Sequence, residues 1–502
     1  MCRAFKALVF AAAALLANAP LEAATIRIAR GALPPSLGVP FTAVGQPSSE
    51  IWIAMFDALT RIDPKGVLQP GLALSWVNTK PATWRFVLRP GLRFHDGSPC
   101  NAQAIIANLE LLQRPESAKY YVSSEVKNIV ALRRIDELTF EIDTREPDAV
   151  LPRRMSMIFI VSPTAWAKLG EDGFAQNPSG TGSFKLVDWG RGSAVTKFVA
   201  FQDSWRAPKV DAIELYTVIE PVRRVQALLS GQIDVAARLG PDELRQLPEQ
   251  GFQIRSLEKS QVMALTFRLV GNEKSPINDV RVRKALAMSV DREGLMRSVF
   301  DGRVKPANQG AAPVTNGYNP SIPPIPFDPA GAKALLAEAG YAKGFKLRIS
   351  VFLGQLASDE LIYQQVAQSI RSLGIDVELR SITYAQWLQS YVTSEWGDTD
   401  LFGWVWDSGS TYDAARPIET ASCVKDHPFN CDPALVPAIR DVASQMDPAQ
   451  RLPRLQELVA RMREAYPAIW ILYVADTYAA SNKVSGLDVW HMGIQYENLS
   501  LK

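Results

Sequence analysis

The stretch from Asp328 to Leu379, DPAGAKALLAEAGYAKGFKLRISVFLGQLASDELIYQQVAQSIRSLGIDVEL, decides the fold class. Asp328 and Pro329 supply an N-cap and a first-turn proline, so they predict a helix that begins there and ends at Gly340. From Phe345 to Val351 apolar and polar residues alternate, which is typical of a strand. This first half of the stretch therefore predicts a helix followed by a strand.

The second half of the stretch repeats this order. Apolar residues recur at helical spacing between Ile362 and Leu373, Gly374 ends the helix, and Ile375 to Leu379 alternate again. Short strands separated by amphipathic helices indicate a mostly parallel, twisted sheet that is covered on both faces. We therefore predict an α/β fold.

A third strand carries the first candidate for ligand contact. Leu401 to Trp406 is almost wholly apolar, which predicts a buried central strand, and Asp407, Ser408 and Gly409 follow it. In open α/β sheets, ligands gather outside the carboxyl ends of the strands. Asp407 is therefore our main candidate; the alternative is that Asp407 only caps a turn and the tryptophans before it are core.

The first half of the chain has a different pattern. Trp84 to Leu88 alternates as a strand, Pro90-Gly91 predicts a turn, and Leu92 and Phe94 lead to Asp96-Gly97, where we expect a hairpin with His95 inside its loop. Asn101 is then expected to cap a helix.

The composition excludes some partners. The 502 residues include 54 basic and 52 acidic side chains, a net charge of only +2, and there is no long basic run. Such a surface cannot neutralise a phosphate backbone, so we expect no nucleic-acid partner.

The start of the chain predicts export. Arg3 and Lys6 precede an apolar run from Ala7 to Ala17 and a small-residue end near Ala24, as in a secretory signal peptide over residues 1–24. The run is about half the length needed to span a bilayer, so a retained anchor is the weaker interpretation. Cys2 precedes the apolar run, which argues against a lipoprotein, and no later segment predicts a membrane-embedded protein.

The mature chain then holds Cys100, Cys423 and Cys431. In an oxidising compartment the close spacing of Cys423 and Cys431 favours a disulfide between them and leaves Cys100 over. A metal site is the competing interpretation, but the only nearby imidazole is His427. We expect no metal and no cofactor.

The sequence contains little that would indicate a catalytic site. There is no Gly-x-Ser-x-Gly motif, and His95 is more typical of a residue that orders a turn than of a catalytic base. Gly180 and Gly182 lack the Lys-Ser ending of a phosphate-binding loop. We therefore expect that the protein is not an enzyme.

Six segments together resemble the extracytoplasmic peptide- and nickel-binding components of ABC importers, the dipeptide and oligopeptide type (family 5). They are Leu68–Trp76, Leu88–Ala107, Gly180–Leu186, Leu228–Asp234, Asp279–Asp291 and Asp328–Tyr341. The resemblance implies a periplasmic-binding-protein-like type II fold with two lobes, an extra domain, mixed sheets and a two-strand hinge.

By this resemblance the chain divides into three regions after the signal peptide. Region one is expected at 24–59, 176–263 and 476–502, region two at 60–175, and region three at 264–475. The crossover segments of the hinge would be Val262–Phe267 and Ile471–Ala475.

The resemblance also implies a binding site. In peptide-binding relatives an aspartate after a Gly-Trp pair holds the peptide amino group, and Gly403-Trp404-Val405-Trp406-Asp407 fits that pattern. Trp404 and Trp406 would wall the pocket. Further candidate ligand contacts are Arg268, which stands where relatives often have asparagine, and Gly45 and Gln46.

Two differences from the relatives leave the identity of the ligand undetermined. Dipeptide-binding relatives continue with Asp-Pro after the aspartate, whereas this chain has Thr411-Tyr412-Asp413. The arginine that some relatives place at the start of a helix to meet the ligand carboxylate has no match at Ala357–Glu360.

The resemblance implies a monomeric, periplasmic solute-binding subunit that captures a short peptide by hinge closure and delivers it to a membrane permease. One alternative is the same fold binding a nickel complex, an opine or an oligosaccharide. A more distant alternative is an exported hydrolase.

Overall fold

A computed structural model describes residues 24–34, 36–43, 48–354, 356, 358–425 and 427–502. The leader expected over residues 1–24 therefore lies outside the described residues except for Ala24, and so do the candidate contacts Gly45 and Gln46.

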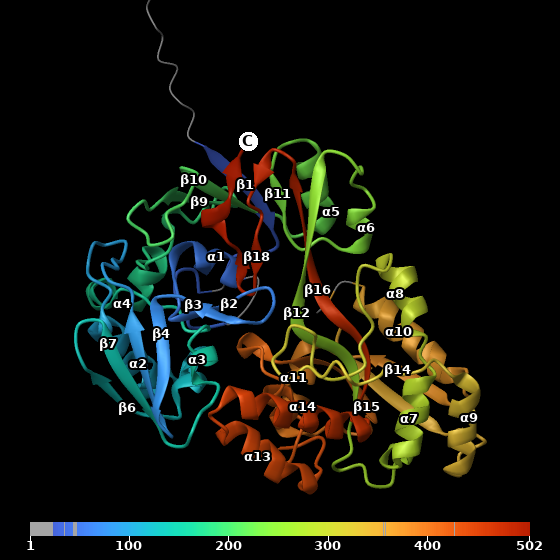
Figure 1. Ribbon diagram of the computed structural model, residues 1–502. Helices are drawn as coiled ribbons and strands as arrows, with labels where there is room; N and C mark the ends of the chain where they lie inside the picture. Colours follow the sequence, from blue (N-terminus) through green and yellow to red (C-terminus); the bar gives the residue numbers. More distant parts are fainter. Residues whose placement is uncertain (1–23, 35, 44–47, 355, 357, 426) are drawn as a thin grey trace, which may run out of the picture.

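Two long strands, β12 (Phe252–Phe267) and β16 (Ala468–Ser481), join the two lobes of the molecule (Figure 1). They pair with each other in the middle of a ten-stranded mixed sheet of order β14-β13-β15-β12-β16-β11-β1-β10-β9-β8. The sheet is thus continuous from one lobe to the other. The expected type II fold and its two-strand connection are confirmed.

The lower lobe of Figure 1 contains the three strands that the sequence predicted, β13 (Lys346–Val351), β14 (Asp376–Ser381) and β15 (Leu401–Asp407). β13 is parallel to both of the others, and β15 pairs antiparallel with β12. The helices α9 (Pro329–Glu338) and α10 (Asp359–Arg371) also form where they were expected, and the Asp328 carboxylate accepts a hydrogen bond from the Gly331 N–H at 2.8 Å as the N-cap of α9. β15 is buried along its length up to Asp407, as predicted.

The upper lobe carries the other half of the large sheet and a second, smaller sheet. Its share of the large sheet is β1 (Thr25–Arg30), β8 (Phe184–Asp188), β9 (Val195–Ala200), β10 (Ala212–Thr217) and β11 (Val235–Ala236). The smaller sheet is antiparallel and has the order β4 (Ala73–Lys80), β5 (Thr83–Leu88), β7 (Thr139–Thr144), β6 (Ile129–Arg134).

The hairpin predicted around Asp96-Gly97 forms as a short turn after the strand: Arg93 and Pro99 make an antiparallel bridge, and the Phe94 N–H donates to the Ser98 carbonyl oxygen at 2.9 Å. β5 pairs with β4 before it and with β7, about fifty residues later, and the chain leaves the sheet after Leu88. It continues into α2 (Ala102–Gln113), which Asn101 caps as expected by accepting a hydrogen bond from the Ala104 N–H. A turn signal fixes a local bend, but the partner of a strand is chosen by contacts distant in sequence.

The remaining elements cover the sheets and connect them. They are α1 (Ser48–Met55), β2 (Thr60–Ile62), β3 (Leu68–Pro70), α3 (Leu151–Arg154), α4 (Pro163–Gln176), α5 (Pro221–Leu229), α6 (Pro241–Leu244), α7 (Val280–Met288), α8 (Arg292–Phe300), α11 (Tyr384–Thr393), α12 (Ala415–Thr420), α13 (Val436–Ser444), α14 (Pro448–Glu464), β17 (Val484–Ser485), β18 (Val489–Trp490), β19 (Gly493–Ile494) and β20 (Ser500–Leu501).

The apolar cores separate the two lobes. One cluster of buried side chains is drawn from Val262 to Val474, and another from Ile26 to Leu257 together with Tyr478 to Leu499. The expected regions one and two share this second core, so the limits between them remain a prediction. Each lobe therefore has its own packed interior, and the two meet through β12 and β16.

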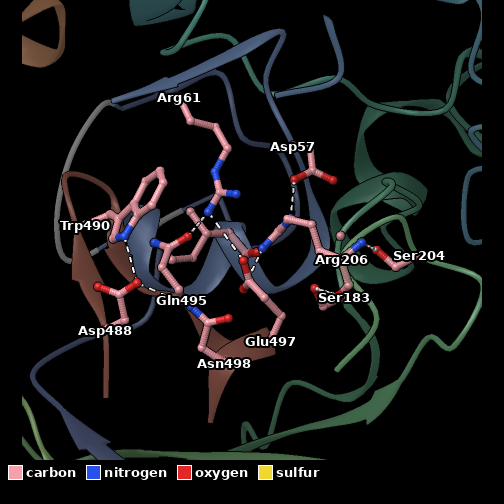
Figure 2. A network of polar contacts seen from close by, with 12 residues as sticks. Asp57, Arg61, Ser183, Ser204, Arg206, Asp488, Trp490, Gln495, Glu497 and Asn498 are labelled. Atoms are coloured by element: carbon pink, nitrogen blue, oxygen red, sulfur yellow. Dashed lines mark hydrogen bonds and ion pairs between the residues drawn. The ribbon is translucent and has the colours of Figure 1, made fainter. Parts of the chain in front are cut away.

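A buried ion-pair network fixes the C-terminal segment to the upper lobe (Figure 2). Arg206 lies 2.8 Å from the Asp57 carboxylate and 2.7 Å from that of Glu497, and Arg61 lies 3.3 Å from Glu497. Burial, together with the positive charge of Arg206 beside it, lowers the pKa of Arg61 to about 10. Glu497 thus links two guanidinium groups that are separated by more than a hundred residues.

The predicted disulfide between Cys423 and Cys431 is present. Cys100 is the remaining thiol among the described residues; it is buried, and burial raises its pKa.

His95 orders a turn, which is the role favoured by its sequence context. One ring nitrogen, Nε2, lies 3.0 Å from the carbonyl oxygen of Gly182, and Nδ1 accepts from the Gly180 N–H at 3.5 Å. Burial, with a smaller contribution from the positive charge of Lys185, lowers the pKa of His95 to about 4. The neutral ring therefore joins the loop after β5 to the glycine turn before β8.

We expect Glu497→Gln to lower the free energy of unfolding by about 3 to 5 kcal/mol, the range for removing one partner of a buried ion pair. The loss arises because the guanidinium groups of Arg61 and Arg206 stay buried with one carboxylate fewer. Urea unfolding of both proteins measures it. Glu220→Gln is the control, since its pair with Arg223 is exposed and should change stability by less than about 1 kcal/mol. Equal effects of the two substitutions would contradict the role of the network.

We also expect stability to fall as the pH falls from about 6.5 to about 4 through His95. In that window the unfolded chain binds a proton on the imidazole and the folded chain does not, so acid favours unfolding by about 3 kcal/mol over the whole range. Carboxylates contribute their own pH dependence, so the readout is the difference between wild type and His95→Gln in free energy of unfolding against pH. The variant should have the shallower slope, and parallel curves would refute the assignment.

Candidate functional site

Asp407 stands at the carboxyl end of β15, in the wall of a cavity of about 420 Å³ between the lobes. Its carboxylate accepts hydrogen bonds from the Gly409 N–H at 2.7 Å and from Nε2 of Gln261 at 3.0 Å. Both donors are neutral, and within the described part of the chain Asp407 forms no ion pair. A carboxylate held in this way keeps acceptor capacity for a cation.

The two connecting strands form one side of this cavity. Lys259 and Gln261 of β12 border it, as do Val474 and Asp476 of β16. These are alternate positions of each strand, so their side chains lie on one face of the ribbon. The pairing of Gln261 with Asp407 continues that face onto β15. We call this cavity the polar cavity.

The rest of its lining comes from segments far apart in the sequence. These include Tyr121, Arg238, Tyr391, Trp404, Arg416 and His491. Arg416 of the lower lobe donates to the Tyr121 hydroxyl at 3.0 Å and lies 3.4 Å from the Glu125 carboxylate of the upper lobe. The lobes therefore touch beside the polar cavity.

A second cavity of about 440 Å³ adjoins the first, and its lining is mainly apolar. Its apolar wall residues include Ile219, Met263, Phe300, Val304, Ile362 and Leu472. Four residues border both cavities, namely Arg238, Leu356, Val474 and Asp476. We call it the apolar cavity, and these four residues the junction.

The structure brings only part of the expected site together. Trp404 borders the polar cavity, and its ring packs against Tyr391 and Phe429. Trp406 is fully buried, does not border the cavity, and donates its indole N–H to the Thr266 hydroxyl at 3.0 Å. Since neighbours in a strand point to opposite faces, Trp406 lies away from Asp407 and in the core.

Arg268 also does not border the cavity. Its guanidinium is buried and donates to the backbone carbonyl groups of Thr399, Gly271 and Gly397 at 2.7, 2.8 and 3.1 Å. It holds a loop of the lower lobe rather than meeting an anion in the cavity.

Sequence reasoning missed three groups that line the polar cavity. Lys259 stands in the polar run Glu258–Gln261 of β12, and Asp476 ends the apolar run of β16, which was the available signal. Arg238 follows the short strand β11 and had no local signal.

His491 is a further missed group, in addition to these three. Neither of its ring nitrogens has a hydrogen-bond partner among the described residues, and the ring contacts Tyr412 edge-on at 4.5 Å between ring centres. Burial lowers its pKa well below the usual value, and the positive charge of Lys259 adds to this. It therefore presents a neutral imidazole to the cavity wall.

Two kinds of feature are absent from the described residues. No group of three or more His, Cys, Asp or Glu side chains there is placed to hold a metal ion. No described helix combines the length and the apolar character needed to cross a bilayer.

Comparison with known proteins gives consistent results. Over 86% of both sequences the chain is 25% identical to the di/tripeptide-binding protein 2 of Pseudomonas aeruginosa. It shares its fold with the periplasmic binding protein DppA of Helicobacter pylori, solved with the peptide STSA (20% identity, TM-score 0.76, 95% of this chain and 98% of that one). It also shares it with NikA of Brucella suis, solved with Fe(III)-EDTA (21% identity, TM-score 0.82, 95% and 100%).

A family model matches residues 67–425, which include β4 to β7, the glycine turn before β8, the connecting strand β12 and Asp407. Together with the two lobes and the cavity between them, this match shows that the chain belongs to the bacterial extracellular solute-binding proteins of family 5.

Proposed function

We propose that the protein is the solute-binding subunit of an ABC importer, and that it captures a short peptide by its amino group in the polar cavity. The observation that carries the proposal is the Asp407 carboxylate, which faces the cavity with hydrogen bonds only to neutral donors. An ammonium group would give it charge-assisted hydrogen bonds.

The size and position of the site support a small ligand. A cavity of about 420 Å³ is within the range of about 300 to 1,000 Å³ that is usual for small-molecule sites. It lies between two lobes with separate cores, so a ligand that contacts both lobes favours the closed arrangement by its difference in affinity for the two states.

The peptide class is supported by the names of relatives. The Pseudomonas relative is named for di- and tripeptides, and the Helicobacter structure holds a peptide. The Brucella structure holds a metal chelate instead, so a non-peptide solute is the competing ligand class. Mass spectrometry of ligand extracted from the purified protein distinguishes them.

The setting follows from the same proposal. The Cys423–Cys431 disulfide suits an oxidising compartment such as the periplasm, to which the predicted leader would direct the chain. There the loaded monomer would dock on a membrane permease and release the peptide unchanged, without catalysis.

We expect Asp407→Asn to weaken the binding of a free-amine peptide by about 1.5 to 3 kcal/mol, the range for hydrogen bonds to charged groups. Isothermal titration with a tripeptide measures the change, and the N-acetylated peptide should lose a similar amount against wild type. Asp376→Asn is the matched control, because Asp376 is an exposed aspartate of the same lobe on β14. Unchanged affinity in Asp407→Asn would remove the residue from the site, and a wide peptide panel that never binds would refute the peptide assignment.

A further inference from the structure

Lys259 borders the polar cavity beside the junction residues Arg238 and Asp476, and these three side chains together carry more positive than negative charge. Asp476 lies 3.4 Å from the Lys259 ammonium and 3.8 Å from the Arg238 guanidinium, so two cations share one carboxylate. All three side chains border the polar cavity.

The hydrogen-bond donors of Lys259 and Arg238 lack acceptors among the described residues, apart from Asp476. The Lys259 side chain is only 12% exposed, yet neither it nor the Arg238 side chain donates a hydrogen bond to any residue that the structure describes, apart from the long contacts to Asp476. An ammonium carries three donors, and a nearly buried charge without acceptors is unfavourable. The junction thus lacks an acceptor, and an anionic oxygen pair would supply it.

Arg416 is the other cation of the polar cavity, and it is already satisfied. It lies 3.4 Å from the Glu125 carboxylate and donates to the Tyr121 hydroxyl at 3.0 Å. The excess positive charge therefore belongs to Lys259 and Arg238, and the negative charge of Asp407, which Arg416 reaches only through a longer-range electrostatic interaction, has no ion-pair partner among the described residues. A zwitterion fits this separation of charge.

The apolar cavity begins at the same junction. Its wall includes Phe300, Val304 and Leu472, and it offers about 440 Å³, which is ample for one large apolar side chain. A residue whose carboxylate lies at the junction has its side chain next to this space.

We propose that Lys259 and Arg238 bind the carboxylate of a short peptide and that the apolar cavity takes the side chain of that same C-terminal residue. This inference rests on the proposed function, in which Asp407 holds the amino group. It adds a prediction about selectivity: the protein should prefer peptides that have a free C-terminal carboxylate and end in a large apolar residue.

The test compares Ala-Leu and Ala-Ala-Leu with their C-terminal amides and with Ala-Asp and Ala-Ala-Asp by isothermal titration. Wild type should bind the amides about 10- to 100-fold more weakly than the acids, the loss expected for hydrogen bonds to a charged group. The Asp-terminated peptides should also bind at least about tenfold more weakly than the Leu-terminated ones, because they leave the apolar cavity without apolar contact.

Lys259→Gln should reduce the acid-to-amide ratio to less than about threefold. Because the ratio is measured within one protein, a general loss of folding cannot imitate this result. Lys305→Gln is the control, since Lys305 pairs with Glu258, the neighbour of Lys259 on β12, and should keep the wild-type ratio.

Equal binding of acids and amides by wild type, or an unchanged ratio in Lys259→Gln, overturns the carboxylate site. If N-acetylation still weakens binding in that case, the role of Asp407 stands and only this inference falls. Binding by none of the free peptides overturns the proposed function, and this inference with it.

Discussion

The hydrogen-bond ladder between β12 and β16 is the constraint on which the rest of the molecule depends. The two strands pair from Phe252 with Ser481 at one end to Thr266 with Ala468 at the other, across both lobes. The ladder shifts register between Glu258 and Val262, where β12 changes from the upper-lobe sheet to its pairing with β15. Because a bulge locally disrupts a ladder, the irregularity lies where two rigid bodies need to bend.

The same ribbon is also the wall of the site. Side chains at alternate positions must share a face, so the residues that border the cavities, Lys259, Gln261 and Met263, are fixed by the pairing and not by separate loops. Burying Lys259 and Asp476 there costs free energy that an apolar pair would not. This cost is reasonable at a binding site, where polar groups orient a ligand, and it would serve no purpose in a simple hinge.

Local patterns predicted the lower lobe well and the site only in part. The Asp328 cap, the β13–α10–β14 order and the buried run that ends at Asp407 depend on neighbours in sequence, and all three formed as expected. The pairing of β5 with β7 and the carbonyl groups that surround Arg268 depend on segments that are distant in sequence, and local patterns gave no signal for either. Trp406 could have been assigned to the core from strand alternation alone, since it precedes Asp407 in the same strand. Arg238 could not have been found, because it meets Lys259 only through Asp476, more than two hundred residues away.

The contacts beside the polar cavity bear on how closure is controlled. Arg416 meets Tyr121 and Glu125, and Arg153 donates to the Thr411 carbonyl oxygen at 3.0 Å, so polar groups join the lobes there. The Arg416 side chain keeps 29% of its surface exposed, and partly solvated ion pairs of this kind contribute about 1 kcal/mol or less. Such contacts orient the lobes, and a ligand held between them, as we propose, would favour the closed form only by binding it more tightly than an open form. In the proposed site Asp407 belongs to the lower lobe and Arg238 to the upper lobe, so a ligand that holds both charges would gain its second contact only when the lobes are together.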